Sequence, residues 1–262
     1  MPEYDPNNPP DPPVPTNIID KEILVGEYLW GMPTENFSTT CDKIPDRVYQ
    51  RAIDAAYEWI ETELTATVIP KNFLDEPHDF KREEYMHWAH FNLYHFPVLD
   101  VLQARAVFPT NQPGDSVKFP PEWHRVYKLS GILNLIPTAG TMAKFIIGRS
   151  GAYLPLVFSG AWDSMPQLFR VDYQAGMNPI PANINEVIGK KAAIEILAII
   201  SDILYPPGTT SISLGIDGVS QNIALTRSQL LFQARINEYK ENIKTEMVQL
   251  RQRWAGIRFS VA

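Results

Sequence analysis

The sequence predicts an α+β protein, with a bundle of three main helices and a β-rich domain inserted between the first and the second helix. Segments with helical spacing of apolar residues cover residues 45–64, 183–204 and 226–254. Between the first two, residues 86–176 hold short alternating runs rich in aromatic and β-branched residues, which indicate strands. The expected domains are an extended acidic proline-rich arm with a hydrophobic anchor over 1–40, a helical bundle over 41–84 and 179–262, and the β-rich domain over 85–178.

The arm, residues 1–40, is defined by proline and by acidic residues. Seven of the 23 prolines fall within residues 1–16, and proline excludes both a helix interior and an inner strand. Lys21 is the one basic residue of the arm against seven acidic ones, which accounts for −6 of the formal net charge of −7. We expect an extended segment, either disordered or laid along a neighbouring subunit, with apolar residues within 18–37 as its anchor.

Each of the three expected helices has its own boundary or packing signals. Pro45 suits the first turn of the first helix, which carries small residues and Trp59 on one face. The second helix is apolar on nearly all sides, as the central helix of a bundle is, and ends before Pro206. In the third helix, Thr226 and Gln229 predict a capping box. A heptad-like seam follows in the third helix, formed by Ile236, Ile243, Met247, Leu250 and Trp254.

Alternating runs predict the strands of the β-rich domain. They cover residues 87–96, 101–108, 125–129, 132–136, 144–147 and 168–171. Turns are expected at 112–115 and at Ser130-Gly131. A further alternating strand, 211–216, leads into Asp217-Gly218, a dipeptide typical of a tight hairpin turn. That segment is expected to be either a hairpin or an exposed edge strand to which a neighbouring chain adds a strand.

Composition excludes several classes of protein. The acidic balance lacks the basic footprint of a nucleic-acid-binding protein. The single Cys41 excludes an intrachain disulfide and a multi-cysteine metal site. The longest apolar run, 192–204, is interrupted by Glu195 and Asp202 and is shorter than the ~20 residues that span a bilayer. The first residues lack the basic and apolar regions of a signal peptide, so we expect neither a membrane segment nor a leader.

Residues 83–95 contain the one group that resembles a metal site. His87 and His90 would share a face of a helix, but the alternation over 87–96 indicates a strand, in which they point to opposite faces. The other members of the group are His95, Glu83 and Glu84. Histidines of a core or an interface are the expected outcome, and no metal is predicted.

Two other groups of residues have some of the residue types of a catalytic site. Residues 148–151 match neither a nucleophile elbow nor a phosphate loop and are expected to form a turn. The acids Glu122, Asp163 and Asp172 are separated in sequence, with nothing to pair two of them as a glycosidase dyad. We therefore predict no catalytic, cofactor-binding or metal-binding residues, and expect that the protein is not an enzyme.

Aromatic residues of the β-rich domain allow two interpretations. They would form either a face on which a sugar stacks or the core of a small β domain, and the core is favoured because such a domain has few layers to bury. The residues are Trp123, Tyr127, Tyr153, Phe158, Trp162, Phe169 and Tyr173.

Several of these segments together resemble tailed-bacteriophage virion proteins. The closest motifs are S-I-S-L-G-I-D-G-V-S-Q at 211–221, A-R-I-N-E-Y-K at 234–240 and G-I-R-F at 256–259. Phe96-Pro97-Val98, the segment 120–123 and Ile136-Pro137-Thr138 are similar to that group as well. The resemblance covers roughly residues 85–262 and leaves the proline-rich arm unmatched. The helical part is similar to head-completion or adaptor proteins of the phage neck.

The resemblance implies a structural adaptor of the virion, assembled in the host cytoplasm. Such a protein forms a homo-oligomeric ring, twelve-fold in that family, between the portal and the tail, and DNA passes through its lumen without sequence-specific binding. The expected partners are other copies of the chain, the portal protein and further neck or tail proteins, with no membrane and no cofactor. The alternatives are a tail or baseplate component, a glycan-binding β module that uses Trp123, Tyr153 and Trp162, and a hydrolase that uses Glu84, His87 and His90.

Overall fold

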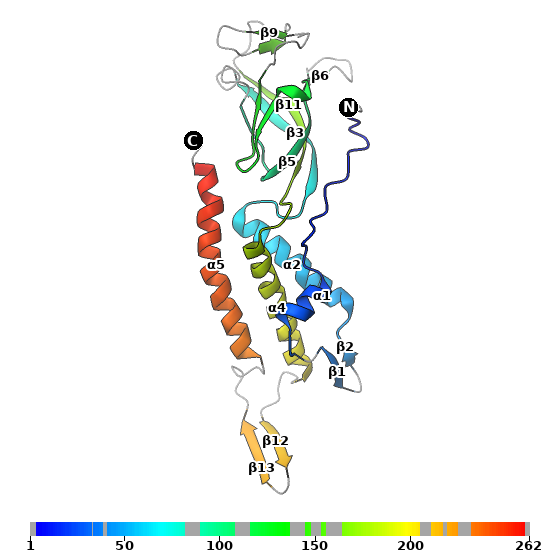
Figure 1. The fold of residues 1–262 in the computed structure, drawn as a ribbon, viewed down its shortest axis with the longest axis vertical. Coiled ribbons are helices and arrows are strands. Elements are labelled where there is room, and N and C mark those ends of the chain that lie inside the picture. The colour runs from blue at the N-terminus through cyan, green and yellow to red at the C-terminus, as the bar shows by residue number, and fades with distance from the viewer. Residues whose placement is uncertain are drawn as a thin grey trace. The chain divides into compact units, whose positions relative to one another are not determined.

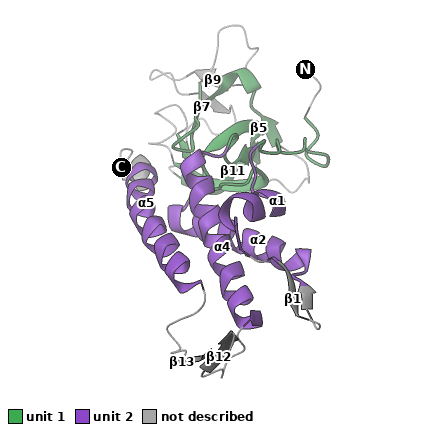
Figure 2. Ribbon diagram, turned by 60° about the horizontal axis from the view of Figure 1, so that its bottom comes forward, with its two compact units in different colours: residues 1–16, 66–179, 257–262 green, residues 17–65, 180–256 purple. Residues whose placement is uncertain are grey.

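The computed structural model confirms the α+β class, because it combines long helices with antiparallel sheets (Figure 1). It describes residues 4–32, 34–38, 41–81, 90–107, 116–136, 145–147, 153–155, 164–204, 211–216, 219–224 and 232–259. The chain forms two compact units, which Figure 2 colours separately. Unit 1 contains Met1–Thr16, Ala66–Pro179 and Ile257–Ala262, and unit 2 contains Asn17–Thr65 and Ile180–Gly256.

The unit boundaries differ from the expected domains in two places. The first sixteen residues belong to unit 1, whereas the sequence predicted a separate arm that ends at residue 40. The β unit begins again at Ala66, about twenty residues before the expected start at 85, because the strand over 71–81 pairs within its sheet. The later boundary, after Pro179, falls within one residue of the expected position.

Unit 1 is built on antiparallel sheets. A four-stranded sheet has the order β3 (Lys71–Lys81), β11 (Ser164–Ala175), β5 (Val98–Val107), β6 (Ser116–Lys118). A three-stranded sheet has the order β4 (Phe91–Asn92), β8 (Ile132–Leu135), β7 (His124–Tyr127), and a short 3₁₀ turn, η2 (Pro121–Trp123), precedes β7. A further pair joins β9 (Phe145–Ile147) to β10 (Tyr153–Pro155).

The predicted strands of this unit agree with the structure in most places. The expectations over 101–108, 125–129, 132–136, 144–147 and 168–171 each overlap an observed strand. The predicted turn at Ser130-Gly131 is confirmed, since Gly131 adopts φ +70° between the paired residues Tyr127 and Ile132. Of the expectation over 87–96, only β4 is observed, and residues 82–89 lie outside the described part of the chain, as do the expected turns at 112–115 and 148–151.

Strand β3 was not predicted, for reasons that its environment explains. It contains Pro77 and five charged residues within Lys71–Lys81, a composition that argues against an inner strand. β3 is an edge strand, where proline loses no ladder hydrogen bond, and its register with β11 shifts in two places. Asp75 adopts φ +56° beside one of these irregularities.

The core of unit 1 lies on one face of the four-stranded sheet. Alternate residues of β11 supply it, with Val171, Tyr173 and Ala175 all fully buried. Phe91 from the second sheet packs edge to face on Phe169, with ring centroids 4.8 Å apart. The remaining members include Phe80, Leu93, Val98, Ala104, Phe119, Trp123, Leu133, Leu135 and Leu168.

Unit 2 contains the long helices. After a short turn, α1 (Lys21–Ile23), and a single π-helical turn, η1 (Leu24–Tyr28), come α2 (Asp46–Leu64), α4 (Ala182–Leu204) and α5 (Gln233–Phe259). These bounds match the first two predicted helices to within one residue, and α5 begins at Gln233, since residues 225–231 lie outside the described part. The predicted seam of α5 is confirmed as a buried face: Ile236, Ile243, Met247, Leu250 and Trp254 are each less than 10% exposed.

Specific contacts join the elements of unit 2. Lys190 of α4 is nearly buried and bonds both Glu186 and Glu246, which ties α4 to α5. The Tyr239 hydroxyl donates to the Tyr28 carbonyl at 2.8 Å, which ties α5 to η1. The ring of Tyr28 lies against Gly189, where a Cβ would come within 2.2 Å of it, so the close approach of η1 to α4 requires glycine at this position.

Two hairpins complete the described structure. β1 (Glu35–Ser38) pairs with β2 (Cys41–Lys43), and β12 (Ser211–Ile216) pairs with β13 (Val219–Ala224). The second hairpin confirms the prediction from the alternating run and its Asp217-Gly218 turn, whose own residues are outside the described part.

Candidate functional site

The face of the four-stranded sheet opposite the core is polar, and we call it the polar sheet face. Its centre is Asp172, which is 1% exposed. The Asp172 carboxylate accepts from Arg105 Nη1 at 2.9 Å and from the backbone N–H of Asp75 at 2.6 Å. Arg105 also bonds the Asp75 carboxylate, and Arg170 reaches the same carboxylate at 3.2 Å. The alternating side chains Arg170, Asp172 and Gln174 of β11 thus lie on this face, away from Val171 and Tyr173 in the core.

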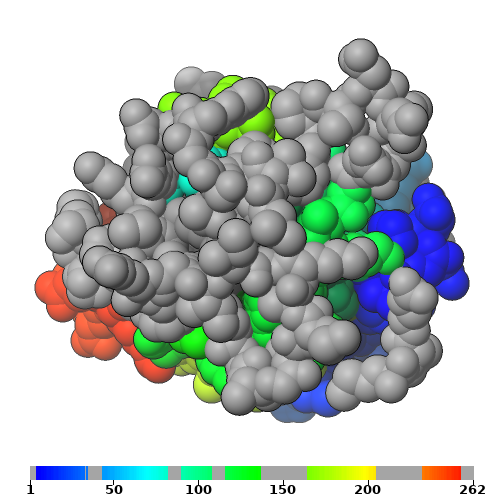
Figure 3. Space-filling view, turned by 90° about the horizontal axis from the view of Figure 1, so that it is seen from above, coloured from blue at the N-terminus to red at the C-terminus, as the bar shows by residue number. Residues whose placement is uncertain are grey.

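The described N-terminal residues 4–16, which we call the N-terminal strap, lie on this face. Asn72 of β3 and Gln174 of β11 are cross-strand partners, and both donate from their side-chain amides to the Pro10 carbonyl, at 2.9 and 3.1 Å. Pro15 is buried, whereas Asp5–Asn8 are exposed in a turn that closes from Asn8 N–H to the Asp5 carbonyl. In the view of Figure 3, the beginning of the described chain, in dark blue, is visible at the surface.

Tyr4 of the strap lies near Asp172. Its hydroxyl oxygen is buried without a hydrogen-bond partner among the described residues, and burial, together with the nearby Asp172, raises the pKa of Tyr4 to about 12. The segment predicted to be disordered or to lie along a neighbouring subunit is therefore held on its own sheet by the hydrogen bonds to Pro10, with Tyr4 near Asp172.

A second polar cluster of unit 1 surrounds Glu76, which is 7% exposed. Its carboxylate accepts from His78 Nε2 at 2.9 Å, from the Tyr173 hydroxyl at 2.5 Å and from the backbone N–H of Tyr94 at 3.0 Å. Burial alone would raise the pKa of Glu76, but these three donors hold it below its usual range. Burial and the hydrogen bond to Glu76 raise the pKa of Tyr173. These three protein donors together satisfy the Glu76 carboxylate.

A small cavity of about 180 Å³ lies beside this cluster. Two of the predicted candidates are nearby but are not brought together: His90 lines the cavity, whereas His95 stacks on Phe73 with ring centroids 3.8 Å apart. Within the described residues, no group of three or more His, Cys, Asp or Glu is arranged to hold a metal ion. Glu83, Glu84 and His87 lie outside those residues. Of the separated acids, Asp172 is paired with Arg105, Glu122 is exposed, and Asp163 is not described.

Three of the four aromatic residues whose side chains are described favour the core interpretation. Trp123, Phe169 and Tyr173 are at most 3% exposed and belong to the core cluster. Tyr127 is 61% exposed. The side chains of Tyr153, Phe158 and Trp162 lie outside the described part of the structure.

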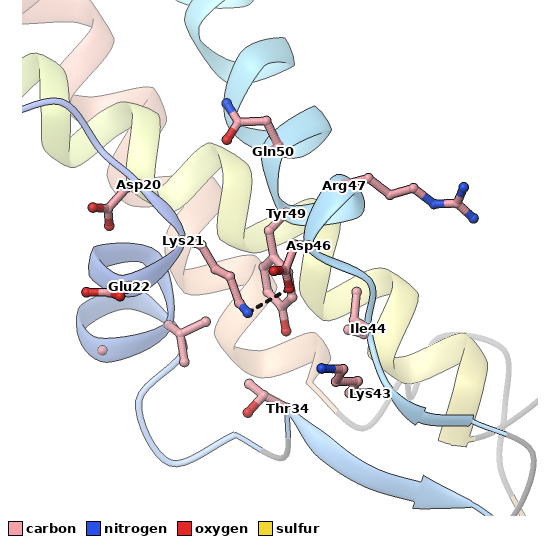
Figure 4. A pocket seen from close by; sticks show the side chains of 12 residues that line it. Asp20, Lys21, Glu22, Thr34, Lys43, Ile44, Asp46, Arg47, Tyr49 and Gln50 are labelled. Atoms are coloured by element: carbon pink, nitrogen blue, oxygen red, sulfur yellow. Dashed lines mark hydrogen bonds and ion pairs between the residues drawn. The ribbon is translucent and has the colours of Figure 1, made fainter.

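Unit 2 contains a larger, open cavity of about 830 Å³ between α1, η1, β2 and the start of α2 (Figure 4). Its charges are mixed. Lys21 spans part of the cavity to bond Asp46 at 2.8 Å, and its ammonium group lies 5.5 Å from the centre of the Tyr49 ring. Figure 4 shows Arg47 pointing away from the other lining side chains. With both signs of charge in it, the cavity defines no single ligand chemistry.

His124 of β7 is half-buried, and its buried Nε2 atom has no hydrogen-bond partner among the described residues. Burial lowers the pKa of His124 to about 4, against the opposing effect of Asp100 and Glu122. An unfolded chain binds this proton near pH 6.5, so between pH 6.5 and 4 the unfolded state holds more protons than the folded state. The stability that a neutral His124 contributes is therefore complete above pH 6.5 and is lost as the pH falls toward 4.

We predict that the substitution His124→Gln removes this component of the pH dependence. The wild-type chain is expected to lose about 2–3 kcal/mol more than the variant between pH 7 and pH 4, because one pKa unit corresponds to ~1.4 kcal/mol. Denaturant unfolding at a series of pH values measures the difference. The exposed His95→Gln serves as the matched control. Parallel curves for wild type and His124→Gln would contradict the prediction.

Comparison with protein-family models finds no matching family, and comparison with curated protein sequences finds no significant relative. Among the helices of the described residues, none combines the length and the apolar character needed to cross a membrane.

Proposed function

We propose that the protein is a structural adaptor of a tailed phage, which forms a homo-oligomeric ring between the portal and the tail. The observation that carries this proposal is the β12–β13 hairpin, which coincides with the 211–221 motif of the resemblance to virion proteins. In this proposal DNA passes through the lumen of the ring, and the protein acts in the virion after assembly in the host cytoplasm.

The hairpin has the composition of an assembly element. Its register pairs Ile212 with Ile223, Leu214 with Gln221 and Ile216 with Val219, so one face of the ribbon carries five aliphatic positions. The other face carries the polar or small positions Ser211, Ser213, Gly215, Ser220, Asn222 and Ala224. No third described strand joins this two-stranded sheet. A lone hairpin is marginally stable in water, so a partner that covers its apolar face would stabilise it.

The edges of this hairpin also favour pairing with another chain. Asp217 is the one charged residue in 211–224, so the strands lack the charges with which proteins commonly protect an edge. Interface centres are likewise depleted of charge. Strand addition between subunits requires such unprotected edges.

Unit 2 would supply the ring wall in this proposal. We infer that α2, α4 and α5 form a three-helix bundle, into which residues 66–179 are inserted as the β-rich domain. The buried seam of α5, the Lys190–Glu246 bond and the bond from Arg251 to Glu63 support this bundle. The net charge of −7 suits a channel along which DNA slides without being held.

The alternatives have different support. A tail or baseplate component would use the same hairpin and differ only in its partner, so the partner must be identified by experiment. A glycan-binding module is less well supported, because Trp123, one of its three proposed residues, is 1% exposed and packed in the core. A hydrolase would need Glu84 and His87, which lie outside the described residues.

We predict that one substitution on the apolar face of the hairpin abolishes assembly. Leu214→Asn places a polar group among the aliphatic positions, whereas Ser213→Asn places the same group on the opposite face as a matched control. The mass of the protein, alone and mixed with portal protein, is measured by light scattering, and the complexes are viewed by negative-stain microscopy.

Rings are expected for wild type and for Ser213→Asn but not for Leu214→Asn, and the three proteins are expected to share one melting temperature. Association with a purified tail or baseplate protein and not with the portal would favour the first alternative. A chain that stays monomeric with every virion protein would reject the adaptor proposal.

A further inference from the structure

The N-terminal strap covers a surface whose hydrogen-bonding groups can also bond to water. Gln103, Asp172 and Gln174 of the polar sheet face are each at most 7% exposed, and all three carry groups that hydrogen-bond to water. An intramolecular hydrogen bond that replaces one to water contributes only about 0.5–1.5 kcal/mol. Release of the strap therefore costs far less than opening the apolar core on the other face of the sheet.

The contacts that hold the strap do not depend on which copy of the chain supplies it. Asn72 and Gln174 bond the main-chain carbonyl of Pro10, and Gln174 also approaches that of Asp11 at 3.5 Å. The strap from any copy presents the same carbonyls, the same Tyr4 and the same Pro15. Its prolines restrict the backbone conformations of the unbound strap, so binding removes little further conformational freedom.

The chain on the far side of the strap is anchored independently. Asn17, the first residue of unit 2, donates to the Ile180 carbonyl at 2.6 Å and accepts from the Ile180 N–H at 3.1 Å. Asn185 donates to the Asn17 carbonyl at 2.7 Å. Between the fixed points Pro10 and Asn17, an extended chain reaches roughly 25 Å. A terminal segment with this reach can transfer to another subunit without threading through it.

We propose that the polar sheet face is a binding site for a proline-rich N-terminal strap, and that in the assembled protein a second copy of the chain supplies that strap. The arrangement within one chain is then the unassembled form. The choice of a second copy as the partner rests on the proposed ring, whereas the site itself rests on the hydrogen bonds that Asn72 and Gln174 donate to Pro10.

Two full-length variants test this exchange by complementation. The first has residues 4–16 replaced by a Gly/Ser sequence of equal length, so its sheet face is vacant. The second carries Asn72→Ala and Gln174→Ala, so its strap has no site on its own chain. The two are mixed, and association is measured by native mass spectrometry and by energy transfer between labelled copies.

The mixed variants are expected to form a heterodimer at a concentration where each alone is monomeric, with roughly tenfold more heterodimer than either homodimer, because two hydrogen bonds distinguish the surfaces. Val14→Ala in the strap, at a position 78% exposed, should leave the heterodimer unchanged. Gln174→Glu, which keeps the shape but removes the donor, replaces the double variant if that variant fails to fold.

A mixture that remains monomeric up to about 1 mM, with both variants folded, would overturn the exchange. Rings on the portal without heterodimers would reject the exchange and leave the adaptor proposal standing. Heterodimers without rings on any portal would support the exchange and reject the adaptor proposal.

Discussion

The substitution Gly176→Ala is expected to destabilise unit 1 by about 3–5 kcal/mol, the largest effect that we predict for a single methyl group. Gly176 follows β11 and adopts φ +144°, a conformation that L side chains rarely adopt. A Cβ at this position would lie 2.4 Å from the Pro70 Cα, and that neighbour is backbone, which cannot rotate away. The N–H of Gly176 also donates to the Pro97 carbonyl at 2.8 Å, so a shift of this segment breaks a bond as well.

Two glycine controls separate the close approach from the loss of glycine itself. Gly131→Ala combines φ +70° with a nearest neighbour at 3.1 Å, and we expect a loss of about 1–2 kcal/mol. Gly26→Ala meets nothing within 4 Å and should be neutral or slightly stabilising. Urea unfolding of the three variants measures these differences in the free energy of unfolding. Equal effects of Gly176→Ala and Gly131→Ala would mean that the contact with Pro70 is unimportant.

Removal of the Glu76 side chain is expected to have the second largest effect. Glu76→Ala leaves His78 Nε2, the Tyr173 hydroxyl and the Tyr94 N–H without their common acceptor, and each unmet buried donor costs about 1–3 kcal/mol. After partial relaxation we expect a loss of about 3–4 kcal/mol. Glu76→Gln retains one acceptor oxygen and should lose about half as much.

The pH dependence of these variants provides a separate check. Because the folded pKa of Glu76 lies below its unfolded value, its contribution to stability is present above the unfolded pKa and is lost as the pH falls through the folded one. The difference between wild type and Glu76→Gln should therefore shrink in acid. Glu122→Gln, an exposed carboxylate of the same unit, is expected to change stability by less than about 0.5 kcal/mol. A difference that stays constant with pH would show that the charge of Glu76 is not what its partners stabilise.

Elements with a strong local period could be predicted from the sequence. The helices α2 and α4 and the buried seam of α5 follow from apolar spacing, because a helix exposes one face to its neighbours whatever those neighbours are. The β12–β13 hairpin follows from alternation and a two-residue turn, which is information contained within fourteen residues. For Trp123, the sequence favoured a core over a sugar-binding face but could not decide between them, since the same aromatic residues suit both. The burial of Trp123 decides for the core.

The polar sites could not be predicted, because their partners are distant in sequence. In the sequence Glu76 resembles any surface carboxylate, because Tyr173, which donates a hydrogen bond to it, lies 97 residues away. The signal for the polar sheet face was equally weak: Asn72 and Gln174 become a pair only through the register of β3 and β11, and Pro10 reaches them across 62 and 164 residues. Proline content alone predicts an extended segment but is silent about the surface that binds it.

Local patterning was thus sufficient for the class of fold, the long helices and the β12–β13 hairpin, since backbone hydrogen bonds and the burial of one apolar face act within single elements. Tertiary structure alone decided that β3 completes the sheet of unit 1, that the first sixteen residues belong to that unit, and that Glu76 and Asp172 are buried. The physical reason is that a buried carboxylate, an edge strand with proline and a strap without its own core are each unstable alone. They become stable only when distant segments supply their hydrogen-bond donors.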